Sequence, residues 1–416
     1  MKDKLSNIYR KVKNSKDSRT LIANFGYLSL LQVAGYIFPL ITIPYLARVI
    51  GVDSFGKIAF ASAVVVWFQT VADWGFNFTA TRDVAKNRDN REKVSEIFSN
   101  VLWARMFLML ISFALLMITI YIIPTFQENK TILLISFLLI PGHILYPDWF
   151  FQAVERMKYI TILNLLSKLL FTVLIFVFIK EKSDFILQPL FNTLGFLVSG
   201  IIAMYVILFR WKIKIIKPNI STVLRTIKGS TDVFINNIVP NLYNSFSVML
   251  LGFYGGAVSN GIFDAGSKFV GIAQQFIGVI ARAFFPFLSR RLDKHNIYVQ
   301  INIYVSLILT LILFLLAPWL IKAFFTEEFY PGITVLRIMS FSVFFISIRN
   351  AYGTHYMILK GYEKDLRNLI FYGSFVGFIL SFPLIYNFSF IGAAINIVIA
   401  QSIMAFLIIN KAKKIK

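Results

Sequence analysis

The sequence predicts an all-α polytopic membrane protein with about 12 transmembrane helices in two six-helix bundles. Hydrophobic residues make up 57% of the 416 residues, and the mean hydropathy is +0.71. Soluble proteins, in contrast, are about 45–50% apolar. Long apolar stretches recur along the chain, each near the roughly 20 residues that a helix needs to cross a bilayer. Basic residues gather in alternate connections between these stretches, which is typical of connections on the cytoplasmic side of a membrane.

A basic, amphipathic segment at 1–20 precedes the first apolar stretch. It lacks the apolar core and small-residue cleavage site of a secretory signal, so we expect the first helix to be retained. The connections are too short to hold a soluble domain. The predicted spans are 21–48, 56–80, 97–123, 131–152, 159–179, 185–209, 229–254, 257–288, 299–325, 332–359, 366–386 and 390–410.

The 42 Lys and Arg residues test this assignment. Thirty of them lie in alternate segments, and only four lie in the other six connections or at the adjoining end of a span. This asymmetry predicts an even number of spans with both termini in the cytoplasm. The net charge of +22 is then explained by cytoplasmic segments beside the membrane surface. We therefore expect no nucleic-acid partner. The basic segments are 1–20, 81–96, 153–158, 210–228, 289–298, 360–367 and 411–416.

The most basic internal connection, 210–228, divides the chain into two halves. We expect one bundle at 21–209 and another at 229–410, with 210–228 as a cytoplasmic linker and 411–416 as a cytoplasmic tail. Both halves begin on the same side, so a duplication would relate them by an axis along the membrane normal. The only sequence support for a repeat is a pair of glycines that opens the second span and a similar pair that opens the eighth: Gly51 and Gly56, Gly256 and Gly261.

Charged residues fall inside the predicted spans, where each costs at least about 2.5–3.5 kcal/mol on insertion scales. Such residues usually pair or face a water-filled interior. The cations outnumber the acids, so the interior is expected to carry a positive potential. The cations are Arg48, Lys57, Arg105, Lys168, Lys268, Arg282, Arg337 and Arg349, and the acids are Asp73, Asp148, Asp232 and Asp264.

Helical spacing places several polar residues on common faces. At 100° per residue, Asp264, Lys268, Gln275 and Arg282 fall on one side of the eighth span. The first, second and seventh spans also carry polar stripes, which predicts a hydrated cleft between the two halves. The expected lining residues of this cleft are Asn24, Gln32, Gln69, Asn236, Tyr243 and Gln275.

Structural roles for the charges remain alternatives. Asp264 and Lys268 are four residues apart and can neutralise each other. Arg105 can form a packing pair inside the first half with Asp73 and Asp148. No cysteine is present, and the three histidines lie in different segments, so we expect no metal site and no catalytic thiol. No phosphate-binding GxxxxGK[ST] loop occurs, and we expect no cofactor.

Three motifs resemble those of the Wzx-type (RfbX-like) O-antigen flippases, which are polysaccharide transporters of the multidrug/oligosaccharidyl-lipid/polysaccharide exporter superfamily. The resemblance covers nearly the whole chain in length and span number, but its specific motifs lie within the first 160 residues. Ala153 stands where the family more often has glycine. The motifs are Pro44-Tyr-Leu-Ala-Arg48-Val-Ile-Gly51 with Phe55-Gly56, Asp73-Trp-Gly75-Phe76 with Thr81-Arg82-Asp83, and Trp149-Phe-Phe-Gln152-Ala-Val-Glu155-Arg-Met157-Lys.

The resemblance implies a V-shaped, MATE/MurJ-like pair of bundles in the bacterial plasma (inner) membrane. It implies a flippase that moves an undecaprenyl-diphosphate-linked oligosaccharide to the outer leaflet by alternating access. A polysaccharide polymerase and a chain-length regulator are the expected protein partners. For the anionic diphosphate and sugars we expect Arg48, Lys268, Arg282 and Arg349, although Arg282 can instead reach the cytoplasmic interface. For a coupling H⁺ or Na⁺ we expect Asp73, Asp232 or Asp264.

Other functions remain as alternatives at this point. A drug antiporter of the same superfamily would be expected to have an acidic cleft. A lipid II flippase would also suit a basic cleft, but that family usually has additional helices. A membrane-integral polymerase or glycosyltransferase often carries a large outer loop, which this chain lacks. A transporter without covalent chemistry is therefore the preferred interpretation.

Overall fold

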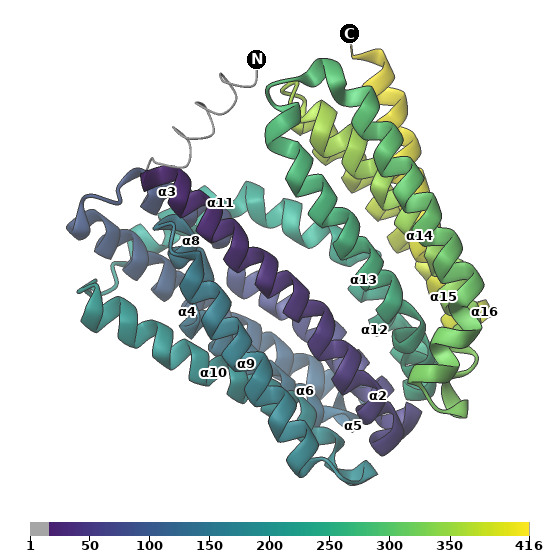
Figure 1. Ribbon diagram of the computed structural model, residues 1–416. Helices are drawn as coiled ribbons and strands as arrows, with labels where there is room; N and C mark the ends of the chain where they lie inside the picture. The colour runs from purple at the N-terminus through teal and green to yellow at the C-terminus, as the bar shows by residue number, and fades with distance from the viewer. Residues whose placement is uncertain (1–15, 416) are drawn as a thin grey trace.

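The computed structural model describes residues 16–415, and the side chains of Asn24 and of 26–415 apart from position 286. Most of the basic segment 1–20 therefore lies outside the described residues. Every regular element in the described part is a helix (Figure 1). The first half contains α2 (Lys16–Asp73), α3 (Phe76–Lys86), α4 (Arg91–Ile122), α5 (Pro124–Glu128), α6 (Lys130–Phe137), α7 (Leu139–Leu145), α8 (Asp148–Ala153), α9 (Met157–Phe178), η1 (Lys182–Ile186), α10 (Leu187–Tyr205) and η2 (Val206–Arg210).

The second half begins with a helix that is interrupted near its middle. Its elements are α11 (Ile220–Ile238), η3 (Val239–Leu242), α12 (Ser245–Tyr254), α13 (Gly256–Leu288), η4 (Leu292–Lys294), α14 (His295–Phe324), η5 (Glu327–Phe329), α15 (Gly332–Arg349), η6 (Asn350–Met357) and α16 (Glu363–Lys414).

Nine helices within 16–415 are long and apolar enough to cross a membrane. Two of them contain a residue with non-helical backbone angles, Gly51 in α2 and Ser389 in α16, and each is two consecutive helices joined at a bend. The broken pair α11 and α12 supplies one further span. These helices together give the expected twelve spans and confirm the predicted all-α membrane fold.

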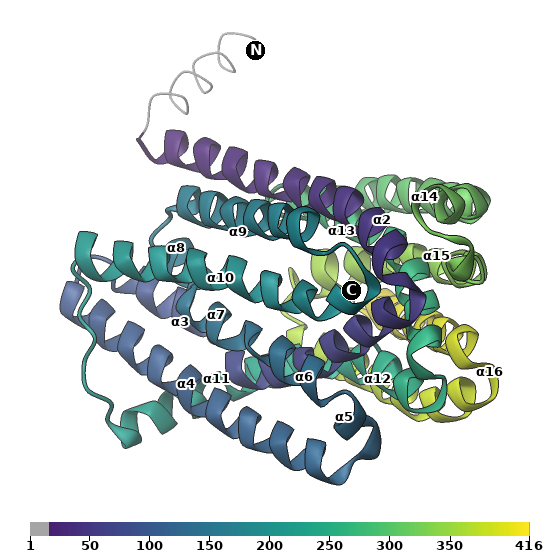
Figure 2. The ribbon, with the colours of Figure 1, turned by 90° about the horizontal axis from the view of Figure 1, so that it is seen from below.

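The helices form two bundles arranged as a V (Figure 1). The bundles meet where α2 bends at Gly51, which we call the elbow end, and their ribbons diverge toward the end that carries both termini, the terminal end. Seen from below, α4, α9 and α10 lie on one side and α14, α15 and α16 on the other (Figure 2). One hydrophobic core centres on Phe98, Phe150 and Phe151 and the other on Phe329 and Leu336.

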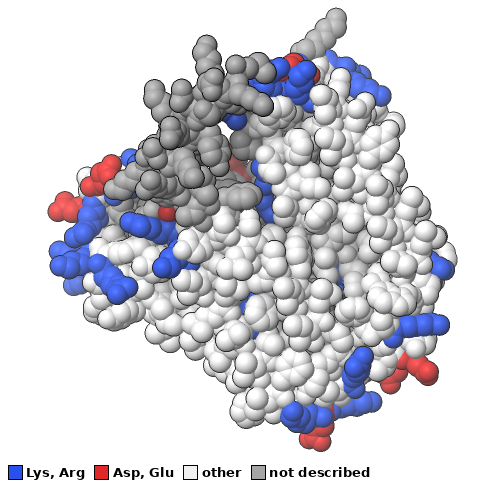
Figure 3. All heavy atoms as spheres, viewed as in Figure 1, with Lys and Arg blue, Asp and Glu red and all other residues white. Residues whose placement is uncertain are grey.

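The charged side chains lie mainly at the two ends of the V. On the face drawn in Figure 3 they gather at the terminal and elbow ends, and a mostly uncharged band lies between them. Large apolar side chains such as Leu110, Leu315 and Phe406 are exposed on the helices. An apolar band between charged ends is the surface that a bilayer requires.

The two glycine pairs meet at the elbow end. Gly51 and Gly256 both adopt left-handed backbone angles, with φ of 71° and 73°, and each lies at the turn between two spans. Left-handed backbone is readily adopted by glycine because it lacks a Cβ atom. The positive φ shared by these two glycines strengthens the case for an internal repeat, for which the sequence offered only spacing.

Two spans differ from the predicted continuous helices. The predicted span 131–152 is divided into α6, α7 and α8, and α6 ends at Phe137, four residues before Pro141. A proline ring clashes with the carbonyl four residues earlier and removes a donor, which explains the break. Helix α11 begins at Ile220, inside the expected linker 210–228, and ends just before Pro240.

Candidate functional site

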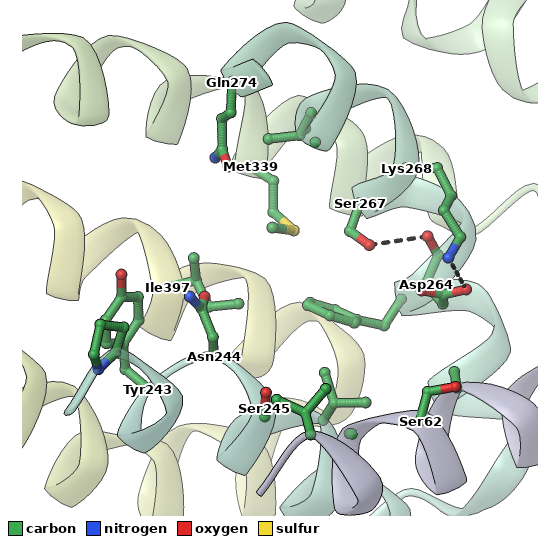
Figure 4. A pocket seen from close by; sticks show the side chains of 18 of the residues that line it. Ser62, Tyr243, Asn244, Ser245, Asp264, Ser267, Lys268, Gln274, Met339 and Ile397 are labelled. Carbon is green, nitrogen blue, oxygen red and sulfur yellow. Dashed lines mark hydrogen bonds and ion pairs between the residues drawn. The ribbon is translucent and has the colours of Figure 1, made fainter. Parts of the chain in front are cut away.

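A central cavity of about 580 Å³ lies between the two bundles. Helix α2 contributes Ser62, the interrupted seventh span contributes Tyr243, Asn244 and Ser245, and α13 contributes a row of polar side chains. Figure 4 shows these groups around the cavity. Its main polar lining residues are Ser62, Gln188, Tyr243, Asn244, Ser245, Asp264, Ser267, Lys268, Gln274, Arg349 and Gln401.

The acid and the lysine predicted on the eighth span form an ion pair inside this cavity. Lys268 Nζ lies 2.8 Å from Asp264 Oδ2, and the Ser267 hydroxyl donates to the Asp264 carbonyl oxygen at 2.9 Å (Figure 4). The Lys268 ammonium also lies 5.9 Å from the centre of the Phe55 ring. Lys268 therefore reaches the cavity with its charge balanced by Asp264 on the same helix.

A smaller cavity of about 290 Å³ adjoins the central one, and both are lined by Ile58, Gln188, Asp264 and Lys268. Lys168 of α9 also lines the smaller cavity and is half-buried. Within the described part of the chain Lys168 has neither an ion pair nor a hydrogen bond from its side chain. It is a cation available to an anionic ligand.

Lys168 was expected among the membrane cations but not at the site. A signal was present, because Thr161, Asn164 and Lys168 recur at helical spacing on an otherwise apolar span. Asn192 of α10 lines the same cavity. The fifth and sixth spans therefore contribute to the site together with the four spans that carried the predicted stripes.

Arg349 is the last residue of α15 and is half-buried between two cavities. It lines the central cavity and also a side cavity of about 580 Å³ between α11, η6 and α16. Among residues 16–415 it has no ion-pair partner. Arg337 lies on the same helix but is exposed, and its guanidinium lies 5.5 Å from the centre of the Phe314 ring.

Gln32, Gln275 and Arg282 form a hydrogen-bond bridge between the bundles. The Gln32 amide donates to Gln275 Oε1 at 3.1 Å and accepts from Arg282 Nη2 at 3.1 Å. Asn24 donates to the Glu155 carbonyl oxygen at 3.1 Å. Arg282 therefore bonds to a neutral partner, and its charge stays uncompensated by this contact.

Of four other predicted residues, Tyr243 lines the central cavity, whereas Arg48, Asn236 and Gln69 do not. Arg48 is exposed, and its Nη2 is 3.5 Å from the Ala323 carbonyl oxygen of α14. Asn236 lines the side cavity rather than the central one. Tyr243 is buried, and its hydroxyl accepts from Gln401 at 2.6 Å. Gln69 is half-buried on α2 and does not line the central cavity.

The three candidate ion-coupling acids have different surroundings. Asp73 pairs with Arg105, which is only 7% exposed, as the packing alternative predicted. Asp148 instead accepts from the backbone N–H of Trp149 at 2.8 Å. Asp232 is exposed and lies 4.0 Å from Arg367. Of Asp73, Asp232 and Asp264, Asp264 is the one that lines the central cavity.

The balance of charge around the joined cavities is positive. Lys168, Lys268 and Arg349 line them, and Asp264 is the acid among their lining residues. No group of three His, Asp or Glu side chains in the described range is arranged to hold a metal ion. The site offers cations, amides and hydroxyls, which are ligands for phosphate and sugar groups.

The fold is that of a polytopic membrane protein with a cavity between its two bundles. Its fold is similar to that of the lipid II flippase MurJ in an inward closed conformation, with a TM-score of 0.76 over 92% of this chain and 87% of that one, at 16% identity. It is also similar to a multidrug resistance MATE transporter in an inward-facing conformation, with a TM-score of 0.63 over 94% and 97% of the chains, at 15% identity.

Residues 21–292 match the polysaccharide biosynthesis protein family, and the chain belongs to this family. It is 30% identical to a protein of Escherichia coli (strain K12) over 94% of this chain and 96% of that protein. It is 26% identical to one of Shigella dysenteriae over 94% and 99% of the chains. Both relatives carry the name "Putative O-antigen transporter". At the family level the chain is a polysaccharide-unit transporter and not an enzyme.

Proposed function

We propose that this protein is a flippase for undecaprenyl-diphosphate-linked oligosaccharide repeat units, and that it moves them from the inner to the outer leaflet of the bacterial plasma membrane. The observation that carries the proposal is the excess of cations around membrane-embedded cavities that both bundles line. Membership of the polysaccharide biosynthesis family supports the saccharide part of the substrate.

The chemistry of the cavities suits the two polar parts of such a substrate. A diphosphate is costly to bring into a low-dielectric interior unless cations compensate its charge. Lys168 and Arg349 have no acid partner among the described residues, so they bind the diphosphate without first losing an ion pair. The amides and hydroxyls of Ser62, Asn244 and Gln274 hydrogen-bond the sugars, while the apolar tail stays in the lipid.

The proposed path runs between the two ends of the molecule. Arg282 receives the diphosphate near the terminal end, which we assign to the cytoplasm from the distribution of Lys and Arg. The Cα atoms of Arg282 and Lys268 are about 21 Å apart along α13, so they act in succession rather than together. Arg48 lies beyond them at the elbow end, where the substrate leaves.

Asp264 is the proposed coupling residue for H⁺ or Na⁺. It is the acid that lines both cavities, and it holds Lys268 at 2.8 Å. Protonation or Na⁺ binding at Asp264 would release the lysine charge to the substrate. The occupancy of Asp264 would then be linked to binding of the diphosphate.

A liposome assay tests the function. Purified protein is reconstituted with a diphosphate-linked oligosaccharide that carries a labelled sugar, and the fraction of label exposed to an external glycosidase is followed with time. We expect the protein to accelerate exposure without changing the covalent structure of the lipid. Unaltered exposure, or a change in the covalent structure of the lipid, would contradict the proposal.

Two arginines on one helix provide a matched pair for this assay. Arg349→Gln removes a cation that lines both large cavities, and we expect at least about a tenfold loss of rate, because a charge-assisted hydrogen bond contributes about 1.5–3 kcal/mol. Arg337→Gln removes a cation from the exposed face of the same helix and should leave the rate unchanged. Equal effects of the two substitutions would remove Arg349 from the proposed site.

A further inference from the structure

The break in the seventh span creates the side cavity next to the central one. Beyond the break, α12 packs against α16 as well as α2, whereas α11 packs against α2, α3 and α4 of the first bundle. Trp74 and Phe234 stack with their ring centres 3.8 Å apart, and Thr79 hydrogen-bonds Ser230 at 2.8 Å. Helix α11 thus separates from α16, and the side cavity of about 580 Å³ fills the wedge between them.

Polar and charged side chains line this wedge, among them an arginine without an acid partner in the described range. Arg349 lies where the side cavity meets the central cavity, and Arg367 lines the wedge from α16. Arg367 is 4.0 Å from Asp232, and Glu363 is the acid among the lining residues. The uncharged donors around these charges are Asn236, Asn350, Thr354 and Asn368.

These four uncharged side chains are free to bind a ligand. None of them hydrogen-bonds another residue within 16–415. Asn350 and Thr354 lie in η6, a π-helical segment that starts directly after Arg349. Such segments are rare and frequently occur at functional sites, because the wider turn changes the direction of the side chains.

Apolar side chains also line the wedge, and two of them are exposed on the surface of the helices. Ile235 of α11 and Phe371 of α16 line the cavity, and each is 41% exposed. Phe375, one turn further along α16, is 45% exposed and does not line the cavity. The wedge therefore extends from exposed apolar side chains to Arg349, which also lines the central cavity.

We propose that this wedge is a lateral port that binds the phosphate-bearing head of a membrane lipid and leads it to Arg349 at the central cavity. The direction of transfer, from the lipid toward the central cavity, rests on the proposed function. Arginine binds phosphate oxygens in bidentate fashion, and basic pockets between membrane helices on the cytoplasmic side bind anionic lipid heads. The volume is within the range of cavities that hold small ligands.

Photocrosslinking tests the port with a matched control on the same helix. A photoreactive benzoylphenylalanine replaces Phe371 in one variant and Phe375 in another, and both are reconstituted in phosphatidylethanolamine with labelled diphosphate-linked oligosaccharide or labelled phosphatidylglycerol. Both positions face lipid, so non-specific crosslinking should be equal. We expect at least fivefold more phosphate-lipid adduct at 371 than at 375, and loss of this difference in Arg349→Gln with Arg367→Gln.

The two labelled lipids distinguish the source of the phosphate. Enrichment of the diphosphate lipid at 371 identifies the transported lipid as the occupant, and enrichment of phosphatidylglycerol alone identifies a bulk phospholipid. Either result supports a phosphate port. Equal adducts at both positions, in a variant that elutes as the parent protein does, overturn it. If the parent protein flips the diphosphate lipid but adducts at position 371 do not exceed those at 375, only the port proposal is contradicted. If adducts are enriched at position 371 but the parent protein does not flip the lipid, only the proposed function is contradicted.

Discussion

Gly56 lies against the carbonyl oxygen of Ala257 so closely that a Cβ atom on Gly56 would come within 1.7 Å of that oxygen. Gly261 has the equivalent relationship to the first bundle, because its Cβ would come within 2.2 Å of the Val52 carbonyl oxygen. The contact seals the two bundles at the elbow end. Arg48 and Glu328 add polar contacts across the same junction.

Gly56→Ala should weaken the seal at the elbow end. The extra methyl group has no space, and overpacking costs about 1–3 kcal/mol, which shifts the equilibrium between sealed and opened states by about 5- to 150-fold. A single cysteine at Ser62, which lines the central cavity, should then react faster with an impermeant maleimide added from the elbow side. Gly229→Ala is the control, since its Cβ would meet nothing within 4 Å. Equal labelling rates in the two variants would refute the seal.

Asp73→Asn should lower the stability of the folded protein. It leaves the buried Arg105 without its acid partner, and breaking a buried ion pair costs about 3–5 kcal/mol. We expect a lower unfolding temperature in detergent, and substantial recovery when Arg105→Met is added. An unchanged unfolding temperature together with lost transport would instead identify Asp73 as an ion-coupling residue.

Asp264→Asn and Lys268→Gln separate charge balance from ion coupling. The single Asp264→Asn variant leaves Lys268 unbalanced and should transport poorly. If the pair only balances charge, the double variant recovers transport. Because we assign coupling to Asp264, we expect the double variant to stay inactive whether or not an ion gradient is applied. Recovery of gradient-driven flipping in the double variant would contradict the assignment.

Arg282 should need both its charge and its planar shape. One of its nitrogens is used by Gln32, which leaves others for phosphate oxygens. We expect about a tenfold loss of flipping in Arg282→Lys and a larger loss in Arg282→Ala, with normal amounts of protein in the membrane. Arg337→Ala is the matched control for removing an exposed cation. Normal flipping by Arg282→Ala would exclude this residue from the path.

The orientation is open to direct measurement because the chain has no cysteine. Single cysteines at Gln127 and Ser183 are expected outside the plasma membrane and should react with an impermeant reagent in intact spheroplasts. A cysteine at Asn219, between η2 and α11, should react only after permeabilisation. The reverse pattern would invert the proposed direction of transport.

The number of spans could be predicted from sequence because it depends on local properties. Apolar length and the alternation of Lys and Arg are both read along the chain, and they predicted twelve spans correctly. The face of the eighth span was also predictable, since helical periodicity aligns Asp264 with Lys268. Breaks were harder to place: Pro141 and Pro240 were visible, but the course of α11 beyond its break was not.

Which residues far apart in the sequence contact each other was determined by the tertiary structure alone. Arg105 meets Asp73 across two helices, and Gln32 meets Arg282 across two bundles, because packing sets which faces touch. From the sequence, Lys168 and Arg337 were both expected as cations within membrane spans. In the structure, the side chain of Lys168 lines a cavity, whereas that of Arg337 is exposed on the surface. Sequence thus determined which charges enter the membrane, and the packing of the helices determined which of them a substrate can reach.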